Sequence, residues 1–412
     1  MNKIHVSLAA LLISGSIASA NEVPLVTSGG TKVSIYGRLE LNASYEDGAT
    51  SAMWSANAAS PARGPEGDKI DPQGRTTLSI ARTRLGLNLS GSSKEDEPDL
   101  RGRFEVDFAG NSNYNNFNGS SGLRIRQSWG SVNYKNLGLT LLFGMTDDLI
   151  LPLDPPAVHP TAFNGVSNVG SRRPQIRITQ AIGPTEVAVA ATHDHLRVAD
   201  NVASSSPALQ ARAGLKLPAS WAGEKANWAL GVGYLFAKDE AANADNDKRN
   251  PRGPETSLIG IDLSLPLLVN LALTGEWFMG QNLSRYGNGS LGLDHTTESN
   301  PDKVKADGIK SMGWWCALSA KLPAKISAAS GIGMENLDES TVIPGSRKNN
   351  MFVFANLGYN FTSAAVVTFE WVTLATDYAD RIGLDDSGSV QNTKVDSGNL
   401  NRYEVNFRYN FR

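Results

Sequence analysis

The sequence lacks several features that would define its class by themselves. One cysteine, Cys316, occurs among 412 residues, so an internal disulfide is excluded. The 38 basic and 41 acidic residues nearly balance at a net charge of −3, which gives no indication of a nucleic-acid partner. No segment approaches the roughly 20 consecutive apolar residues of a membrane-spanning helix. A soluble protein and a transmembrane β-barrel both remain possible, because half of each barrel strand faces water.

The first twenty residues, "MNKIHVSLAALLISGSIASA", differ from the rest of the chain. Lys3 precedes an apolar run through Leu12, and small residues follow at 18–20. This is the pattern of a secretory signal peptide, and the run is too short to be a membrane anchor. The sequence therefore predicts cleavage before Asn21 and a site of action outside the bacterial cytoplasm. It divides the chain into a signal peptide (1–20), a short N-terminal segment (21–31) and one domain (32–412).

The chain ends in "NRYEVNFRYNFR", in which aromatic or aliphatic residues occupy every second position. Tyr403, Val405 and Phe407 alternate with Arg402, Glu404 and further polar residues. Strict alternation is typical of a β-strand with one apolar and one polar face.

Segments of this kind recur from Lys32 onward with turn residues between them. They predict sixteen strands near 32–45, 75–90, 99–108, 123–134, 139–145, 173–180, 184–193, 207–217, 225–238, 255–265, 268–280, 309–322, 324–335, 349–361, 363–375 and 400–411. An even number of strands is typical of closed bacterial barrels. The predicted fold class is all-β, a transmembrane antiparallel β-barrel of about sixteen strands.

The connections alternate between long and short along the chain. Short ones include "KNLG" at 135–138 and "IGP" at 181–183. The long ones, rich in Gly, Asn, Asp and Ser, lie near 46–74, 109–122, 146–172, 194–206, 239–254, 281–308, 336–348 and 376–399. Outer-membrane barrels have long extracellular loops and short periplasmic turns, whereas a β-sandwich or a propeller has no reason to sort its loops this way.

The two faces of the strands indicate which medium lies on each side. Sixteen strands enclose more volume than side chains can fill, so we expect water inside the barrel and lipid outside. Aromatic residues near the strand ends are then expected in the two interfacial girdles. They are Trp228, Tyr234, Phe236, Trp277, Phe278, Tyr359 and Phe361.

Arginine is unusually frequent on the expected inner face of the first six strands. The set is Arg38, Arg82, Arg84, Arg101, Arg103, Arg124, Arg126, Arg173 and Arg177. One interpretation is an electropositive wall that draws small anions through a constriction. The other is a structural network in which these guanidinium groups pair with Glu40, Glu105, Asp107 and an inserted loop. The sequence leaves both open.

The third long connection, "TDDLILPLDPPAVHPTAFNGVSNVG", is the candidate for a loop folded into the lumen. It combines four prolines with an apolar LILPL stretch, which stiffens the loop and favours burial. We expect Asp147, Asp148 and Asp154 to form a constriction loop opposite the arginines. The alternative is an extracellular loop that packs at a subunit interface.

The sequence gives little support for a catalytic site or a metal-binding site. His193 and His195 would share a strand face, but two imidazoles are too few for a metal site. The five histidines form no plausible arrangement with serine and aspartate, so no enzyme, metal or cofactor is predicted. Cys316 is expected to be an apolar residue that packs or faces lipid.

Several stretches together resemble the DcaP-like family of outer-membrane porins. They are "KVSIYGRLEL", "RTTLSIARTRLGLNL", "LRGRFEVDF", "GLRIRQSWGSV", "LLFGMTDDLILP" and "GSRRPQIRIT", all between residues 32 and 180. The resemblance implies a trimeric sixteen-stranded porin that passes small dicarboxylate-type anions. It also implies constriction arginines, which match Arg82, Arg84, Arg101, Arg103, Arg124, Arg126 and Arg177.

The leading hypothesis is therefore a passive diffusion porin of a Gram-negative outer membrane, with residues 32–412 as its barrel domain. It passes small hydrophilic solutes and prefers anions. Its expected partners are small anions, the lipid bilayer with its lipopolysaccharide, and two further copies of the chain, without nucleic acid. The alternative is a non-conducting outer-membrane barrel that serves adhesion or structural contacts. Conductance in a planar bilayer distinguishes the two.

Overall fold

The computed structural model describes most of the chain after the predicted signal peptide. The described residues are 24–28, 30–48, 58–60, 74–91, 97–110, 122–159, 163, 166–193, 202–203, 206–221, 224–238, 240–241, 255–286, 309–339, 342, 345–384 and 390–411. Residues 1–20 lie outside them, as do His195 and parts of the long connections.

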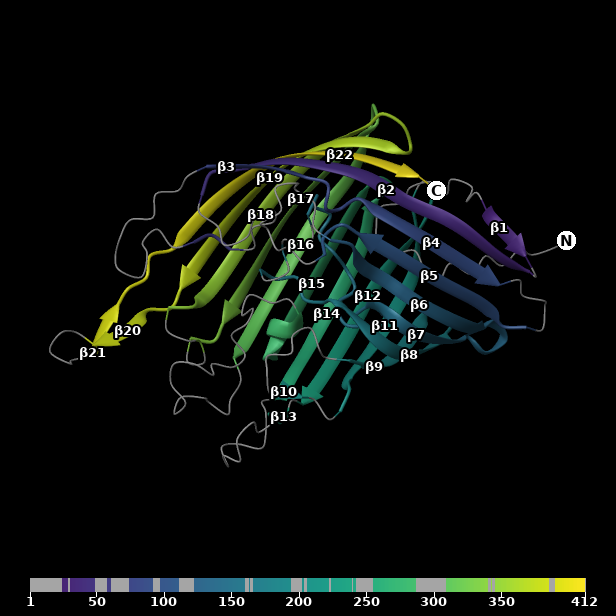
Figure 1. Cartoon of the computed structure of the whole chain (residues 1–412), viewed down its shortest axis with the longest axis horizontal. Coiled ribbons are helices and arrows are strands. Elements are labelled where there is room, and N and C mark those ends of the chain that lie inside the picture. Colours follow the sequence, from purple (N-terminus) through teal and green to yellow (C-terminus); the bar gives the residue numbers. More distant parts are fainter. Residues whose placement is uncertain are drawn as a thin grey trace.

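The chain forms a closed antiparallel barrel of sixteen strands, which confirms the predicted fold class (Figure 1). The first eight positions are taken by β2 (Thr31–Glu46), β3 with β4 (Arg75–Ser79 and Arg84–Gly91), β5 (Asp99–Asp107), β6 (Arg124–Tyr134), β7 (Leu139–Asp147), β8 (Arg172–Ile182), β9 (Thr185–Thr192) and β11 (Ala208–Trp221). The second eight are β12 (Glu224–Lys238), β14 (Glu255–Leu268), β15 (Leu271–Gln281), β16 (Lys310–Leu322), β17 (Ile326–Leu337), β18 (Arg347–Asn360), β19 (Ala365–Tyr378) and β22 (Gly398–Phe411).

The first and last strands close the barrel. In Figure 1 the purple strand β2 runs beside the yellow strand β22. Their register extends from Gly37 opposite Phe411 to Glu46 opposite Arg402. Before this seam, β1 (Pro24–Ser28) pairs with the beginning of β2. β3 and β4 both pair with β2 and act as one strand that is interrupted at 80–83.

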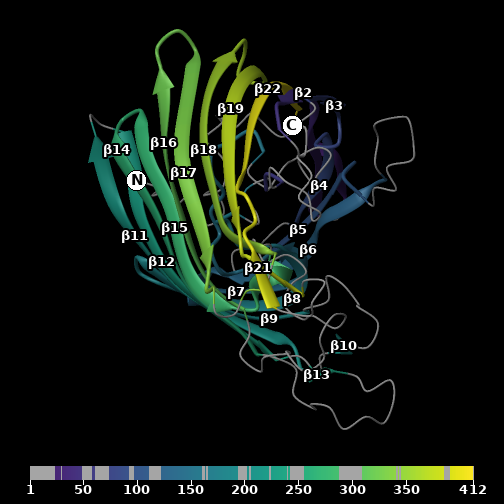
Figure 2. The same ribbon diagram turned by 90° about the vertical axis from the view of Figure 1, so that its left-hand side faces the viewer.

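The connections are sorted by length as predicted. Short ones lie at one end, for example the turn η1 (Lys135–Leu137), which closes on Gly138 with a φ of 63°, a backbone conformation that favours glycine. Long ones lie at the other end, where two small two-stranded sheets form. In one, β10 (Val202–Ala203) pairs with β13 (Glu240–Ala241) of the next long connection, and in the other, β20 (Arg381–Leu384) and β21 (Val390–Thr393) form a hairpin. In Figure 2 the labels β10, β13 and β21 lie toward the same end of the barrel.

The outer surface is apolar along the strands. On the closing strand Tyr403, Phe407 and Tyr409 are 42%, 50% and 51% exposed, while the alternate residues Arg402 and Glu404 are buried inside. The aromatic face of the chain's end therefore points outward, which is the arrangement that lipid requires. Within the described parts of the chain, no helix is long and apolar enough to span a membrane.

One predicted girdle residue is placed on the wrong side of the wall. Trp277 and Met279 face outward, but Phe278 lies between them and points inward, where it is fully buried. It packs with Leu258 and Leu283 in a cluster under the third long loop. The prediction was wrong because it used residue type, whereas the period of two places Phe278 on the inner face.

Candidate functional site

The third long loop, residues 148–171, folds into the barrel and crosses its interior. Its backbone is fixed by acidic residues of the wall opposite the arginines: Leu153 N donates to Glu276 Oε1 (2.7 Å) on β15, and Val158 N donates to Glu370 Oε2 (2.6 Å) on β19. Pro156 O accepts from Asn356 Nδ2 at 2.9 Å. The loop thus lies inside, against the β11–β19 wall, and the predicted insertion is confirmed.

Apolar contacts hold the same loop at two places on the inner wall. Phe163 is fully buried and stacks on Phe352 with ring centroids 3.8 Å apart, and on Phe354 at 5.6 Å. Ile150 and Leu151 fill a second cluster against β12, β14 and β15. The LILPL stretch therefore packs against the inner wall rather than at a subunit interface.

A second long connection also enters the interior, which the sequence did not indicate. Ala59, from the loop after β2, is fully buried in the cluster around Phe163. Ala59 N donates to Thr376 Oγ1 at 3.0 Å, and the Tyr378 hydroxyl donates to Ala59 O. Small residues without periodicity give no signal for such an anchor.

The first arginine cluster surrounds one buried carboxylate at the seam. Glu40 lies 2.8 Å from Arg38, 3.4 Å from Arg82 and 3.4 Å from Arg408. Arg408 comes from β22, so the last strand contributes a cation that the candidate set did not include. The Glu40 side chain is fully buried, and these three guanidinium groups share its charge.

The second cluster spans β4, β5 and β6. Glu105 pairs with Arg126 at 2.8 Å and with Arg84 at 3.8 Å. Asp107 pairs with Arg124 at 2.7 Å and with Arg126 at 3.2 Å. Arg124 retains an exposed side-chain fraction of 39%, whereas Arg126 retains 9%, so Arg124 presents its charge to the lumen and Arg126 is mainly a structural partner.

The loop carboxylates have three different surroundings. Asp154 is exposed on the loop and interacts electrostatically with Asp147, Arg172 and Arg126. Asp147, at the end of β7, is half-exposed and lies 3.5 Å from Arg172. These two carboxylates face the second arginine cluster, so this is the region in which loop and wall oppose each other in charge.

Asp148 and Arg173 form a buried pair instead. Their side chains are each 1% exposed, at an N–O distance of 3.0 Å, and Gln210 Nε2 donates to the same carboxylate. The guanidinium of Arg173 also lies over the Tyr286 ring at 3.8 Å. Neither residue presents charge to the lumen, so this pair anchors the start and the end of the loop.

The remaining three predicted arginines are less enclosed. Arg101 is 44% exposed and lies 3.8 Å from Asp99. Arg177 donates to Gln175 Oε1 (3.0 Å) and to Asp147 O (2.6 Å). Arg103 donates through Nε to Asn88 Oδ1 at 3.0 Å, and its guanidinium lies over the Tyr36 ring.

Arginines outside the predicted set also lie on the inner wall. Arg402 and Arg408 share the inner parity of β22, and Arg212 pairs with Asp262 at 2.7 Å across β12. The same alternation argument would have found them if it had been extended past the sixth strand. Arg172 is different because it begins β8, where parity gives no guide.

The arrangement combines both interpretations of the arginines. Seven of the nine have a carboxylate within 4 Å, namely Arg38, Arg82, Arg84, Arg101, Arg124, Arg126 and Arg173. Paired guanidinium groups still present donors to water where they are exposed, as at Arg101 and Arg124. Whether this wall selects solutes stays a prediction.

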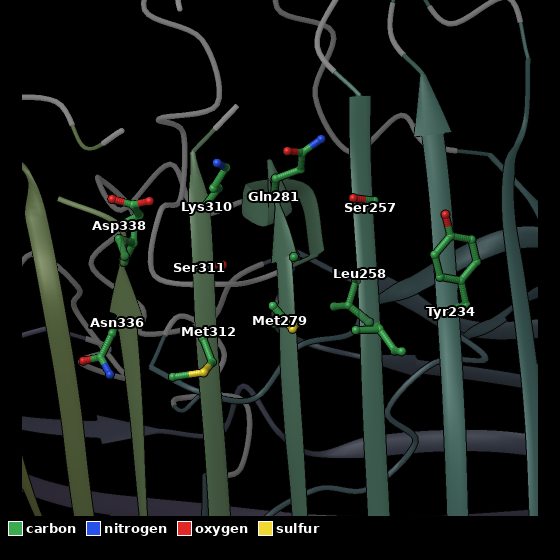
Figure 3. Close-up of a pocket in the computed structure, with 13 residues that line it drawn as sticks. Tyr234, Ser257, Leu258, Met279, Gln281, Lys310, Ser311, Met312, Asn336 and Asp338 are labelled. Atoms are coloured by element: carbon green, nitrogen blue, oxygen red, sulfur yellow. The ribbon is translucent and has the colours of Figure 1, made fainter. Parts of the chain in front are cut away.

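A separate hollow lies on the outside of the barrel (Figure 3). Tyr234, Met279 and Met312 form its apolar part, and Lys310 and Gln281 lie above them at the ends of β16 and β15. These side chains point away from the lumen, so the hollow is not part of a solute path. In the described ranges no group of three His, Cys, Asp or Glu residues could hold a metal.

The sequence matches no protein-family model and no curated protein sequence. Among solved structures, the outer membrane channel DcaP of Acinetobacter baumannii aligns with a TM-score of 0.69 at 18% identity, over 94% of this chain and 99% of that chain. An anion-selective porin from Comamonas acidovorans gives 0.55 at 13%, over 92% and 100%. OmpT of Vibrio cholerae, in a trimer form, gives 0.55 at 12%, over 93% and 100%. The chain therefore has the fold of the outer-membrane porins, and its resemblance to the DcaP-like porins is confirmed at the level of the fold.

Proposed function

We propose that this protein is an outer-membrane porin through which small hydrophilic solutes diffuse passively, with a preference for anions such as dicarboxylates. The observation that carries the proposal is the charge asymmetry inside a closed barrel. Arginines of β4, β5, β6 and β8 line one wall, and an inserted loop with Asp154 faces them from the other. A barrel that served only adhesion would need neither the inserted loop nor the opposed charges.

The exposed arginines give the proposed preference its physical basis. Arg124 and Arg101 have 39% and 44% of their side chains exposed, so a passing anion can exchange water for guanidinium donors there. One such charge about 4 Å from an anion contributes on the order of 1 kcal/mol in bulk-like water. The Comamonas neighbour is described as anion-selective, which favours the same preference here.

The test is a reversal potential in a planar bilayer under a potassium chloride gradient. Purified protein should open steady water-filled channels, and the potential should have the sign of chloride selectivity. The preference should weaken as salt rises, because the Debye length falls to roughly 3 Å at 1 M. Membranes that stay silent at high protein load would support the non-conducting barrel instead.

We further propose export with cleavage of residues 1–20, insertion into the outer membrane beside lipopolysaccharide, and assembly as a homotrimer. Transport is the whole of the proposed activity, without enzymatic chemistry. The trimer is supported by the Vibrio cholerae neighbour, described in a trimer form. Native mass measurement in mild detergent tests it, and a monomer at all concentrations would contradict it.

A further inference from the structure

Two arginines of the predicted set, Arg103 and Arg177, have no carboxylate within 4 Å among the described residues, whereas the other seven have one. Arg177 donates through Nη2 to Asp147 O and through Nε to Gln175 Oε1. Arg103 differs from it because only its Nε is bonded, to Asn88 Oδ1, an uncharged acceptor, at 3.0 Å. The two Nη groups make no hydrogen bond within the described chain and are not buried. Arg103 therefore presents a full positive charge and an open edge to the lumen.

The position of this guanidinium is fixed by its surroundings. Its Cζ atom lies 5.1 Å from the centroid of the Tyr36 ring, within the range of a cation–π interaction. The Tyr36 hydroxyl donates to Glu105 Oε2 at 3.0 Å, which holds the ring across β4. Gly86 is the register partner of Tyr36, and a Cβ at Gly86 would overlap the ring. The absent side chain thus provides the space in which Tyr36 lies flat.

Asn88 determines which edge of the guanidinium remains open. It is the direct register partner of Arg103 on β4, and its Oδ1 accepts the hydrogen bond from Nε. A carboxylate therefore has the end-on approach to Nη1 and Nη2, in which each oxygen accepts one hydrogen bond. A single ammonium could not offer this planar pair of donors.

From this geometry we infer that Arg103 is the docking group for carboxylates in the lumen and that Tyr36 is its positioning residue. The inference rests on the proposed anion channel and names the residue on which its selectivity depends most. The paired arginines then set the general electrostatic potential of the wall. Arg103 binds the passing carboxylate through its free Nη1 and Nη2 groups.

The first experiment compares reversal potentials of matched variants. Arg103→Gln should lower the anion-to-cation permeability ratio by about fivefold, because an uncompensated charge at contact distance is lost. Arg101→Gln makes the same change of net charge two residues along the same strand, at a guanidinium that already lies 3.8 Å from a carboxylate, Asp99. It therefore removes the same general potential but no open docking group, and the effect should be smaller. A ratio that falls as much in Arg101→Gln as in Arg103→Gln would overturn the assignment.

The positioning role is tested at constant charge. Tyr36→Leu and Gly86→Ala should each reduce selectivity in the direction of Arg103→Gln, the first by removing the ring and the second by displacing it. Tyr45→Leu is the control, since Tyr45 lies on the same strand and faces outward at 46% exposure. Folded barrels are verified by heat-modifiable migration. Selectivity of Tyr36→Leu equal to that of Tyr45→Leu would remove Tyr36 from the proposal.

Binding of a carboxylate by the two Nη donors of Arg103 is tested with potassium acetate as the probe. Conductance should saturate with acetate concentration in the wild type, and Arg103→Lys should abolish this saturation while keeping most of the chloride selectivity. Saturation that persists in Arg103→Lys, or that occurs with potassium phosphate and not with acetate, would overturn carboxylate docking. A wild-type channel without anion selectivity would instead refute the proposed function, so the two failures are distinguishable.

Discussion

Replacing Phe163 by alanine should release the inserted loop without opening the barrel. The Phe163 ring is fully buried and is stacked between loop and wall on Phe352, with an interplanar angle of 15°. Removal of a buried phenylalanine costs about 3–5 kcal/mol in protein cores. The barrel itself depends on backbone ladders between neighbouring strands, in which Phe163 takes no part.

The magnitude can be expressed as a change in loop occupancy. Every 1.4 kcal/mol corresponds to about a tenfold change in an equilibrium constant, so a loss of about 3 kcal/mol favours detachment by about a hundredfold. The polar anchors at Leu153 and Val158 remain, so detachment should be partial and transient. We therefore expect larger and noisier single-channel currents than in the wild type.

The assay is single-channel recording in planar bilayers, with Phe369→Ala as the control. Phe369 lies on β19 and is 50% exposed on the outer surface, so the same truncation leaves the loop untouched. Phe163→Ala channels with wild-type conductance and noise, in barrels that still migrate as folded protein, would refute the view that this ring holds the loop.

Three further predictions follow from other parts of the structure. Arg126→Gln leaves Glu105 with Arg84 at 3.8 Å as its guanidinium partner, while Asp107 keeps Arg124 at 2.7 Å. The heat-resistant band should unfold at lower temperature, with a loss of stability smaller than the about 3–5 kcal/mol of a buried charge without any partner; an unchanged transition would contradict the pairing. Burial, with the charges of Arg82 and Arg402, lowers the pKa of His159 well below its usual value, so the docked loop loses stability as pH falls below about 6.5, where only the released imidazole is protonated. Channel noise should then rise between about pH 7 and pH 5, and an identical profile in His159→Gln would show that another group is responsible. Protease added to intact cells should cut within 239–254 or 281–308 and leave 135–138 intact, while the reverse pattern would invert the topology.

The fold was predictable because barrel strands follow a strict period of two. All sixteen strands, the alternation of connection lengths and the inserted loop could be derived from residue patterns alone. The outward face of β22 followed from the alternation of Tyr403 and Phe407 with Arg402. Phe278 was misplaced because an aromatic residue on a strand seemed to belong to lipid, although an inserted loop offers it an equally apolar cover.

The candidate site was only partly predictable. Parity placed the arginines on the inner wall, but it could not reveal their partners, because ion pairs depend on the register between strands far apart in sequence. Arg408 reaches Glu40 only because β22 closes against β2. The difference between the buried Arg173 and the open Arg103 likewise depends on the path of the loop and on the asparagine opposite, neither of which has a sequence pattern of its own.

The way in which the loop is anchored also sets the order of assembly. Val158 N donates to Glu370 on β19, 212 residues away in sequence, and His159 Nε2 lies 2.7 Å from Oε1 of Glu404 on the closing strand. Glu404 lies on the last strand itself, so its contact with the loop forms only after that strand has joined the barrel. Contacts across such long separations form late, because the chain between them must be ordered first. A nascent barrel therefore has its inserted loop unanchored, and closure of the seam is the step that fixes this loop across the interior.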